Sequence, residues 1–233
     1  MQLARIHPED TVLEIGPGRG SLTRELSSSA RRVIAIEIDR DLVPGLQSDM
    51  PANVEIVEGD ALTIEFPSES FHLVGNLPYN IATPLFKRFI EHRAHVLDVT
   101  VMIQKEVADR LVAKPGTAEY GPLSVLVQYY ATVTFGFKVP PGAFTPRPKV
   151  DSAVIRLDWK PNVCDAEPFT DFVQRAFGSR RKKLVNNLLS LYGRLGRDEI
   201  VLRLKKAGVN VDARPEELSV GEFLRVYNHL ENE

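Results

Sequence analysis

The stretch Thr11-Val12-Leu13-Glu14-Ile15-Gly16-Pro17-Gly18-Arg19-Gly20 decides the fold that we predict for this chain. Its first half is apolar and β-branched, which predicts a buried strand, and its second half is a glycine-rich turn. Residues 21–26 then have the composition of a helix start. A strand, a glycine turn and a helix in this order cradle nucleotides, because glycine lets the backbone approach the ligand and the helix N-terminus faces it. The G-x-G-x-G spacing is neither a dinucleotide-binding pattern nor a P-loop, so the turn alone does not identify a ligand.

The next three strand candidates also end in polar residues that could hold a cofactor. Glu37 closes the second candidate, where an acid that binds ribose hydroxyls is expected. Asp60 closes the third candidate and could accept a hydrogen bond from an adenine amine, and Asn76 follows the fourth. Each residue alone could be a solvated strand end or a helix cap. Because ligands bind at the carboxyl ends of strands in open α/β sheets, the ordered set that begins at Gly16 predicts a pocket for S-adenosylmethionine.

The tetrapeptide Asn76-Leu77-Pro78-Tyr79 is the candidate for the chemistry. An exocyclic amine on a nucleobase is a poor nucleophile, and the side-chain carbonyl of Asn76 and the backbone carbonyl of Leu77 could accept hydrogen bonds from its two N–H groups. Pro78 stiffens the turn and has no N–H, and Tyr79 offers a flat face on which a flipped-out base can stack. The simpler interpretation is an ordinary strand-to-helix turn. Within the predicted pocket, the tetrapeptide favours a methyltransferase that acts on the exocyclic amine of a base.

On these residues the chain resembles the bacterial small-subunit rRNA adenine dimethyltransferases, the RsmA/KsgA family. The resemblance extends from about Asp10 to the C-terminus. It is carried also by residues 104–111, by Tyr120-Gly121-Pro122-Leu123-Ser124, and by the proline-rich loop at residues 139–152. It implies an α/β, Rossmann-like, class I S-adenosylmethionine-dependent methyltransferase with a mostly parallel seven-stranded sheet and a small C-terminal helical domain. The implied reaction adds two methyl groups to the N6 amine of each of two adjacent adenosines in a hairpin loop near the 3′ end of small-subunit rRNA.

The resemblance also implies a set of site residues. The implied catalytic residues are Asn76, Leu77, Pro78, Tyr79 and Phe144. Phe144 is similar to the second residue of the family that stacks on the base, and its alternative interpretation is a core aromatic under a loop. The implied cofactor-binding residues are Glu14, Gly16, Gly18, Glu37, Ile38, Asp60, Ala61 and Asn76.

The sequence departs from the family pattern ahead of the first strand. Family members usually carry a Gly-Gln-Asn-Phe-Leu-like segment there, which closes over the methionine end of the cofactor, and nothing in residues 1–9 matches it. We therefore expect this lid segment to be missing and the adenosine half of the cofactor site to be retained.

Composition limits the possible classes of protein. The chain has 233 residues, of which 43% are hydrophobic, enough for one α/β domain and a small addition. Its single cysteine, Cys164, excludes a disulfide framework and favours the reducing cytoplasm. We see no signal peptide and no apolar stretch long enough to span a membrane. A pyrimidine C5 methyltransferase would need a nucleophilic cysteine, and Cys164 has no motif around it. The five histidines are scattered, so no metal is predicted.

The charge distribution is unusual for a protein that binds nucleic acid. The formal net charge is −2, whereas most such proteins are basic. A dense basic run at residues 180–183 and two basic residues in the proline-rich loop could still contact phosphates, although a charged run is more often a solvated helix start. The predicted RNA-binding residues are Arg147, Lys149, Arg180, Arg181, Lys182 and Lys183. The expected partner is rRNA in an immature 30S particle, with no membrane and no obligate protein partner.

Hydrophobic periodicity predicts the remaining architecture. We expect a methyltransferase domain over residues 1–159 and a helical, RNA-contacting domain over residues 160–233. The loop at 140–150 is too short for a parallel crossover, so the strands at 132–139 and 152–159 should be antiparallel. The other predicted strand is 96–103, and the predicted helices are 81–92, 105–113, 122–131, 168–177, 180–192, 198–207 and 220–230.

Three functional hypotheses remain open. The first is the small-subunit rRNA adenine dimethyltransferase, which the segments at 104–111 and 140–152 favour. The second is a large-subunit rRNA adenine methyltransferase of the macrolide-resistance type. The third is a non-catalytic ribosome assembly factor with the same fold. The intact tetrapeptide argues against the third hypothesis, whereas the unmatched N-terminal segment argues for it.

Overall fold

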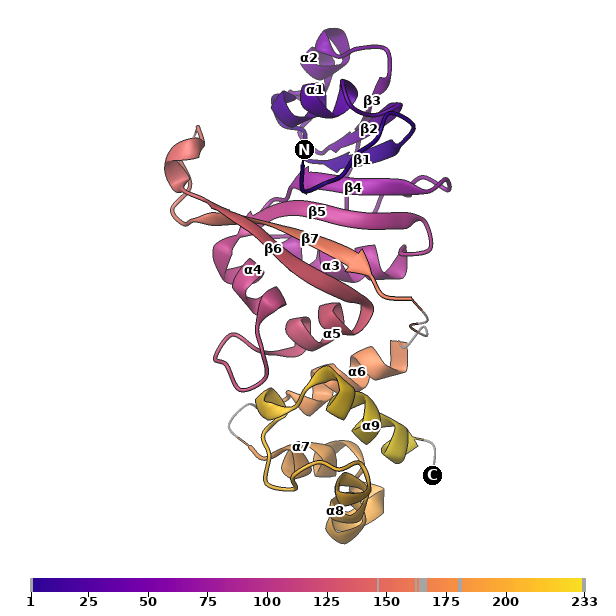
Figure 1. The fold of residues 1–233 in the computed structure, drawn as a ribbon, viewed down its shortest axis with the longest axis vertical. Helices are drawn as coiled ribbons and strands as arrows, with labels where there is room; N and C mark the ends of the chain where they lie inside the picture. Colours follow the sequence, from indigo (N-terminus) through magenta and orange to yellow (C-terminus); the bar gives the residue numbers. More distant parts are fainter. Residues whose placement is uncertain (1, 146, 162, 164–166, 180–181, 232–233) are drawn as a thin grey trace. The chain divides into compact units, whose positions relative to one another are not determined.

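The computed structural model describes residues 2–145, 147–161, 163, 167–179 and 182–231 (Figure 1). Its chain groups into two compact units. The sheet unit comprises residues 1–108 and 131–159, and the helical unit comprises residues 109–130 and 160–233. Residues 109–130, which the sequence pattern assigns to the methyltransferase domain, therefore group with the C-terminal residues.

The sheet unit is built on seven strands in the order β3-β2-β1-β4-β5-β7-β6. Strands β1 to β5 pair in parallel, and β7 pairs antiparallel with both β5 and β6. This arrangement confirms the mostly parallel seven-stranded sheet and its antiparallel last pair. The strands are β1 (Thr11–Ile15), β2 (Arg32–Glu37), β3 (Val54–Glu58), β4 (Phe71–Asn76), β5 (Val96–Gln104), β6 (Ala131–Val139) and β7 (Ser152–Trp159).

Helices lie between most of the parallel strands: α1 (Ser21–Ser27) between β1 and β2, α2 (Val43–Asp49) between β2 and β3, and α3 (Ala82–Glu91) between β4 and β5. Helix α4 (Lys105–Val112) follows β5, and a 3₁₀ turn, η1 (Pro141–Ala143), follows β6. We did not predict α2, because it is short and its sequence, with Pro44 and Gly45 at its start, has little helical periodicity. Strand β3 ends earlier than predicted because the chain turns at Asp60, whose Oδ1 accepts a hydrogen bond from the N–H of Leu62 at 2.8 Å.

The strand order determines where a ligand can bind. From β1 the chain continues to β2 and β3 on one side, and β4 and β5 lie on the other side. The order therefore reverses between β1 and β4. In open α/β sheets the crevice at such a reversal, outside the carboxyl ends of the strands, is the place where ligands bind. Gly16 and Asn76 are at these two strand ends.

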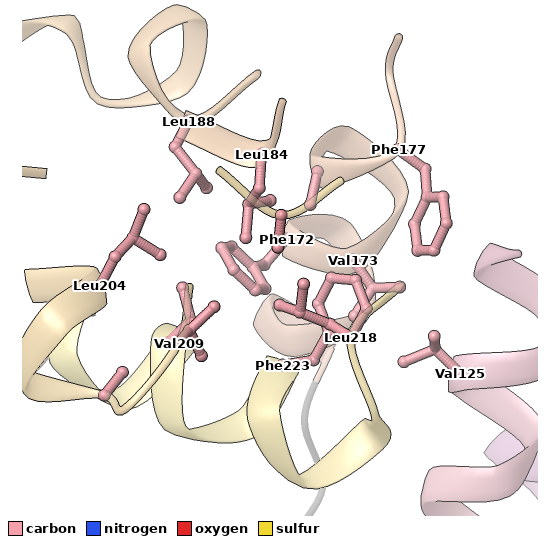
Figure 2. Close-up of a cluster of buried hydrophobic side chains, with 14 of the residues drawn as sticks. Val125, Phe172, Val173, Phe177, Leu184, Leu188, Leu204, Val209, Leu218 and Phe223 are labelled. Carbon is pink, nitrogen blue, oxygen red and sulfur yellow. The ribbon is translucent and has the colours of Figure 1, made fainter. Parts of the chain in front are cut away.

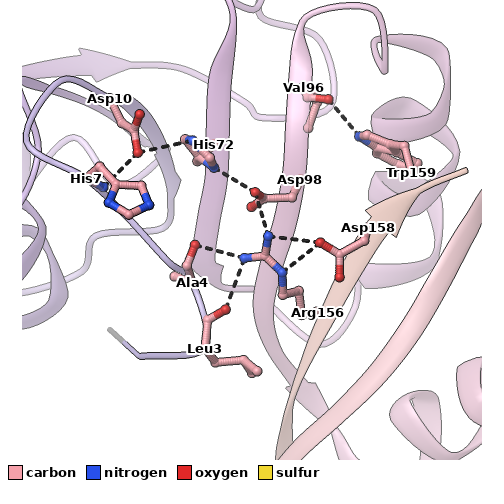
Figure 3. Close-up of polar contacts among 10 residues, drawn as sticks. All are labelled: Leu3, Ala4, His7, Asp10, His72, Val96, Asp98, Arg156, Asp158 and Trp159. Carbon is pink, nitrogen blue, oxygen red and sulfur yellow. Dashed lines mark hydrogen bonds and ion pairs between the residues drawn. The ribbon is translucent and has the colours of Figure 1, made fainter. Parts of the chain in front are cut away.

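A buried ionic network ties the N-terminal segment to the sheet (Figure 3). The guanidinium of Arg156, on β7, donates hydrogen bonds to the carbonyl oxygens of Leu3 and Ala4 at 3.0 and 2.8 Å. It also donates to Asp98 on β5 at 2.8 Å. Nδ1 of His72, on β4, lies 2.7 Å from Asp98. Because a buried charge without a partner is costly, this network holds the segment in one place.

The helical unit has its own hydrophobic core (Figure 2). Tyr120 and Val125 are buried in it together with residues of the C-terminal helices, which explains why residues 109–130 group there. Helix α7 begins at Leu184, because Lys183 before it has an extended backbone, with φ −59° and ψ 148°. The predicted start of this helix, residues 180–181, lies outside the described residues. The helices are α5 (Pro122–Tyr130), α6 (Glu167–Ala176), α7 (Leu184–Leu191), α8 (Gly196–Lys206) and α9 (Val220–Glu231), with 3₁₀ turns η2 (Gly193–Leu195) and η3 (Pro215–Glu217).

Candidate functional site

The glycine loop after β1 leaves its backbone open to a ligand. Gly16 and Gly18 have φ angles of +72° and +58°, a region that residues with a Cβ rarely adopt. A Cβ built on Gly18 would meet no atom within 4 Å, so there is open space beside the loop. Positive φ and an open flank are what a loop needs if its backbone is to approach a bound nucleoside.

The glycine loop lies against the tetrapeptide that follows β4. A Cβ on Gly16 would lie 3.4 Å from the backbone oxygen of Asn76 and 4.0 Å from Cδ of Pro78. The structure therefore brings together two motifs that are about sixty residues apart in the sequence, at the reversal of strand order.

Glu37, the last residue of β2, is oriented toward the glycine loop. Its Oε2 accepts a hydrogen bond from the N–H of Gly18 at 3.0 Å, and its Oε1 accepts one from the N–H of Asp39 at 2.9 Å. The residue is only 5% exposed. Each carboxylate oxygen has two lone-pair sites, so Glu37 can accept further hydrogen bonds from a ligand hydroxyl.

The other residues predicted at this edge differ in exposure. Ile38 is 64% exposed, an unusual state for a large apolar side chain. Ala61 is buried, and Asp60 is partly buried with one carboxylate oxygen used in its own turn. The register pairs Glu37 with Glu58, so the ends of β2 and β3 are adjacent. Among these residues on neighbouring strand ends, Ile38 exposes apolar surface and Asp60 exposes part of a carboxylate, whereas Ala61 is buried.

Glu14 is a buried acid with an unsatisfied oxygen. It is 1% exposed, and among the described residues its Oε2 has no hydrogen-bond partner. Burial raises the pKa of Glu14 to about 7; the Thr23 hydroxyl acts in the opposite direction, and the negative charge of Glu37 raises it further. Such an orphaned acceptor beside an open glycine loop suits a ligand with a cationic or hydrogen-donating group.

The tetrapeptide presents one polar side chain at the sheet edge. Asn76 is exposed, whereas Leu77 is 1% exposed and its N–H donates to the backbone oxygen of Met102 at 2.9 Å. The backbone oxygen of Pro78 accepts from the N–H of Ile81 at 3.2 Å and turns the chain into α3. The turn is fixed by the backbone, which leaves the amide of Asn76 available for a ligand.

Tyr79 is joined to the proline-rich loop by a side-chain contact that we did not predict. Its hydroxyl lies 2.7 Å from Oγ of Ser152, the first residue of β7. Phe144 belongs to the same loop, just after η1, and is partly buried. The sequence signal for Ser152 is its place at the end of the proline-rich loop, which by itself predicts no role for the residue.

A hollow of about 350 Å³ lies between the start of α4 and the proline-rich loop. Its walls mix acidic, basic and apolar side chains. Arg147 and Lys149 in this loop are both exposed. The lining residues are Gln104, Lys105, Glu106, Pro141, Lys149, Val150 and Asp151.

The helical unit carries the rest of the predicted basic residues. Lys182 and Lys183 are exposed, and Nζ of Lys183 pairs with Asp212 at 2.7 Å. Arg180, Arg181 and Cys164 lie outside the described residues. In the described part of the chain, no group of three or more His, Cys, Asp or Glu side chains could hold a metal ion. No helix within the same ranges is long and apolar enough to cross a membrane.

Known proteins resemble this chain over nearly its whole length. Residues 1–232 match the family model described as ribosomal RNA adenine dimethylase. The protein named ribosomal RNA small subunit methyltransferase A from Alkaliphilus oremlandii is 41% identical over 97% of this chain and 84% of its own length. The protein of the same name from Chromobacterium violaceum is 42% identical over 96% of this chain and 86% of its own length.

Two solved structures have the same fold. The crystal structure of a dimethyladenosine transferase from Plasmodium falciparum has a TM-score of 0.82 and 28% identity, and the match covers 96% of this chain and 90% of that one. The crystal structure of the 23S rRNA methyltransferase ErmE has a TM-score of 0.76 and 31% identity, and the match covers 99% of this chain and 94% of that one.

Proposed function

Because this chain belongs to the ribosomal RNA adenine dimethylase family, we propose that it transfers methyl groups from S-adenosylmethionine to the N6 amines of two adjacent adenosines in small-subunit rRNA. The observation that carries this proposal is the contact between the glycine loop and the tetrapeptide. Gly16 approaches the backbone of Asn76 at the reversal of strand order, so a methyl donor and a base amine can meet there.

The chain's residues suit the cofactor. S-adenosylmethionine, when bound, supplies an electrophilic methyl group on a cationic sulfur. Gly16 and Gly18 would let the backbone approach it, and Glu37 would accept hydrogen bonds from the ribose hydroxyls. Asp60 would accept from the adenine amine, with Ile38 and Ala61 against the adenine ring. Glu14, buried and with an orphaned oxygen, would favour the cationic end of the ligand.

The catalytic residues act mainly by position and polarisation. Asn76 and the backbone carbonyl of Leu77 would accept hydrogen bonds from the two N–H groups of the target amine and make its lone pair available for attack. The methylated nitrogen would then lose one proton to water or to one of these carbonyls. Pro78 keeps the turn stiff. Tyr79 would stack on one face of the flipped-out adenine, and Phe144 on the other. Charge develops on the amine during the transfer, so preorganised acceptors stabilise the transition state more than the ground state.

Basic side chains would hold the RNA. Arg147 and Lys149 in the sheet unit, and the run at residues 180–183 in the helical unit, would contact phosphates. Such contacts position the RNA and do not specify its sequence. The substrate would be an immature 30S particle in the cytoplasm, with the target adenosines in a hairpin loop near the 3′ end of the rRNA.

The relatives favour small-subunit rRNA over large-subunit rRNA. The proteins named small subunit methyltransferase A share 41–42% identity with this chain, whereas the 23S rRNA methyltransferase ErmE shares 31%. The proline-rich loop and residues 104–111 support the same choice. A non-catalytic role is disfavoured because the glycine loop, the acids and the tetrapeptide are all present at one edge of the sheet.

A methyl-transfer assay tests the proposal. The protein and labelled S-adenosylmethionine would be incubated with small subunits that lack the modification, and separately with protein-free large-subunit rRNA. We expect label in the small-subunit rRNA only, as dimethyladenosine in nuclease digests. Label in large-subunit rRNA would favour the macrolide-resistance activity. Binding to small subunits without any transfer would favour the assembly-factor role.

A further inference from the structure

A hydroxyl-to-hydroxyl hydrogen bond links the two motifs that carry the chemistry. The oxygen of Tyr79 lies 2.7 Å from Oγ of Ser152, although the two residues are 73 positions apart. Ser152 is fully buried, at 0% exposure, while Tyr79 is only partly buried. The tip of the Tyr79 ring is therefore held from inside the protein while part of the residue remains accessible.

Ser152 is a rigid point in the sheet. As the first residue of β7 it pairs with Gln104 at the end of β5 and with Val139 at the end of β6. The preceding residue, Asp151, accepts a hydrogen bond through its backbone oxygen from the N–H of Lys105 at 2.9 Å. The carboxylate of Asp151 pairs with Lys138 at 2.7 Å. Because the backbone of Ser152 is paired with a strand on each side, its hydroxyl has little freedom to move and can hold the hydroxyl of Tyr79 in one position.

We propose that Ser152 is a positioning residue for methyl transfer, whose buried hydroxyl holds the Tyr79 ring in the orientation that stacks on the flipped-out adenine. This inference rests on the proposed function. A stacking platform is useful only if it is in place before the base arrives, because ordering a loose ring at the moment of reaction costs entropy. The same bond links the tetrapeptide to the loop that bears Phe144, so both stacking residues depend on one anchored segment.

The competing interpretation is that the Tyr79–Ser152 hydrogen bond only stabilises the fold at this end of the sheet. Loss of the bond would then lower the stability of the protein and leave the rate of methyl transfer unchanged. The two interpretations differ in kinetics, because a positioning bond acts on the rate constant of the bound complex and not on the affinity for the cofactor or the particle.

The test uses Ser152→Ala, Tyr79→Phe and the double variant, since each single change removes the same bond. Single-turnover methyl transfer would be measured with saturating cofactor and small subunits that lack the modification. We expect each single variant to be about threefold to tenfold slower, the worth of an ordinary hydrogen bond. The double variant should be no slower than the slower single variant, because the two side chains act through one interaction.

Ser124→Ala is the matched control. Ser124 is also at 0% exposure, and its hydroxyl donates to the backbone oxygen of Arg110 at 2.6 Å in the helical unit. We expect this variant to lower the melting temperature and to keep the wild-type transfer rate.

Two results would overturn the inference alone, in the presence of an active wild-type protein. One is a wild-type transfer rate for Ser152→Ala; if that variant does not fold, a wild-type rate for Tyr79→Phe counts in its place. The other is a double variant whose fold-reduction in transfer rate equals the product of the fold-reductions of the two single variants. A wild-type protein that transfers no methyl group to either RNA would instead overturn the proposed function, and the inference with it.

Discussion

The carboxylate of Glu37 accepts a hydrogen bond from the backbone N–H of Gly18 at 3.0 Å. This bond ties the end of β2 to the glycine loop after β1, so two of the predicted cofactor-binding elements form one unit. A change at Glu37 is therefore expected to affect both the proposed acceptor for the ribose hydroxyls and the loop conformation.

Replacing Glu37 with Ala should weaken the binding of S-adenosylmethionine by about tenfold to a hundredfold. A hydroxyl pair that loses its buried acceptor costs roughly 1–3 kcal/mol, and every 1.4 kcal/mol corresponds to about tenfold in affinity. Titration calorimetry measures the effect. Glu58→Ala is the control, because Glu58 pairs with Glu37 in the β2–β3 register but points its carboxylate to Arg40 at 2.8 Å. Equal affinities for Glu37→Ala and the wild type would remove Glu37 from the pocket.

Glu14 should make the stability of the protein depend on pH between about 4.5 and 7. Burial raises the pKa of this carboxyl, so the folded protein holds Glu14 protonated at pH values at which the unfolded chain has already ionised it. The resulting contribution to the free energy of unfolding is fully present below the ordinary value of 4.5 and is lost as the pH rises through about 7. The free energy of unfolding of the wild type should therefore fall relative to that of Glu14→Gln across this window. The fall should be roughly 3 kcal/mol, since one pKa unit corresponds to about 1.4 kcal/mol.

Urea denaturation of both proteins at a series of pH values measures this difference. Above about pH 7 the difference should be constant and the Gln variant the more stable. Glu25→Gln, which changes an exposed acid on α1, serves as the surface control. A constant difference between wild type and Glu14→Gln from pH 4 to 8 would contradict the raised pKa.

Much of the fold follows from the sequence because its strands are continuous and apolar. The ends of β1, β2 and β7 agree with the predicted bounds, since each is a β-branched or aromatic run limited by a turn residue. Helix α2 escaped prediction because its pattern is short. Residues 109–130 group differently from the predicted domain boundary because the partners of Tyr120 and Val125 lie far away in the sequence, among the C-terminal helices. Local periodicity identifies a buried face but not what packs against it.

His72 should stabilise the fold most at low pH. The hydrogen bond to Asp98 raises the pKa of His72, burial opposes the rise, and the charges of Asp98 and Asp10 add to it while Arg156 opposes it. The stabilisation from protonated His72 is therefore fully present below the ordinary value of 6.5 and is lost as the pH rises above the raised value. His72→Gln should lose more stability at pH 6 than at pH 9, as measured by urea denaturation.

The exposed His95 provides the matched control for this experiment. Its side chain lies at the surface before β5, so His95→Gln should change the free energy of unfolding little at either pH. The same loss at pH 6 and pH 9 for His72→Gln would show that the imidazole acts by packing or neutral hydrogen bonding and not by its charge.

The basic residues should control the salt dependence of particle binding. Arg147→Ala, Lys149→Ala and Lys182→Ala should each reduce the slope of log K against log salt by about 0.7–0.9 for every phosphate that is no longer neutralised. Cofactor affinity should not change. Filter binding to small subunits at several salt concentrations gives the slopes. Lys87→Ala, an exposed lysine paired with Glu91 on α3, is the control. Unchanged slopes for all three variants would mean that these side chains are simply solvated.

Candidate site residues could be named from the sequence where the residue type indicates a chemistry, whereas their contacts with other segments could not be predicted. Glycines, acids at strand ends and the tetrapeptide all stand out in the sequence. The bond of Glu37 to Gly18 and the bond of Tyr79 to Ser152 do not, because each joins residues from separate segments, 19 and 73 positions apart, whose side-chain contacts depend on how the strands are placed in the sheet. The sequence therefore names candidates, whereas the structure shows which of them touch.

Asn76→Ala should abolish most of the methyl transfer and leave the fold and particle binding intact. Asn76 is exposed at the end of β4 and its backbone is held by the sheet, so loss of its amide should cost little stability. If the Asn76 amide accepts a hydrogen bond from the amine as the amine gains positive charge, its removal should slow methyl transfer by about 10²–10³-fold. Single-turnover transfer at saturating cofactor measures this, with circular dichroism and particle affinity as controls. A variant that keeps more than about a tenth of the wild-type rate, well above the 10²-fold loss, would mean that Asn76 only shapes the turn and that the backbone carbonyls activate the amine.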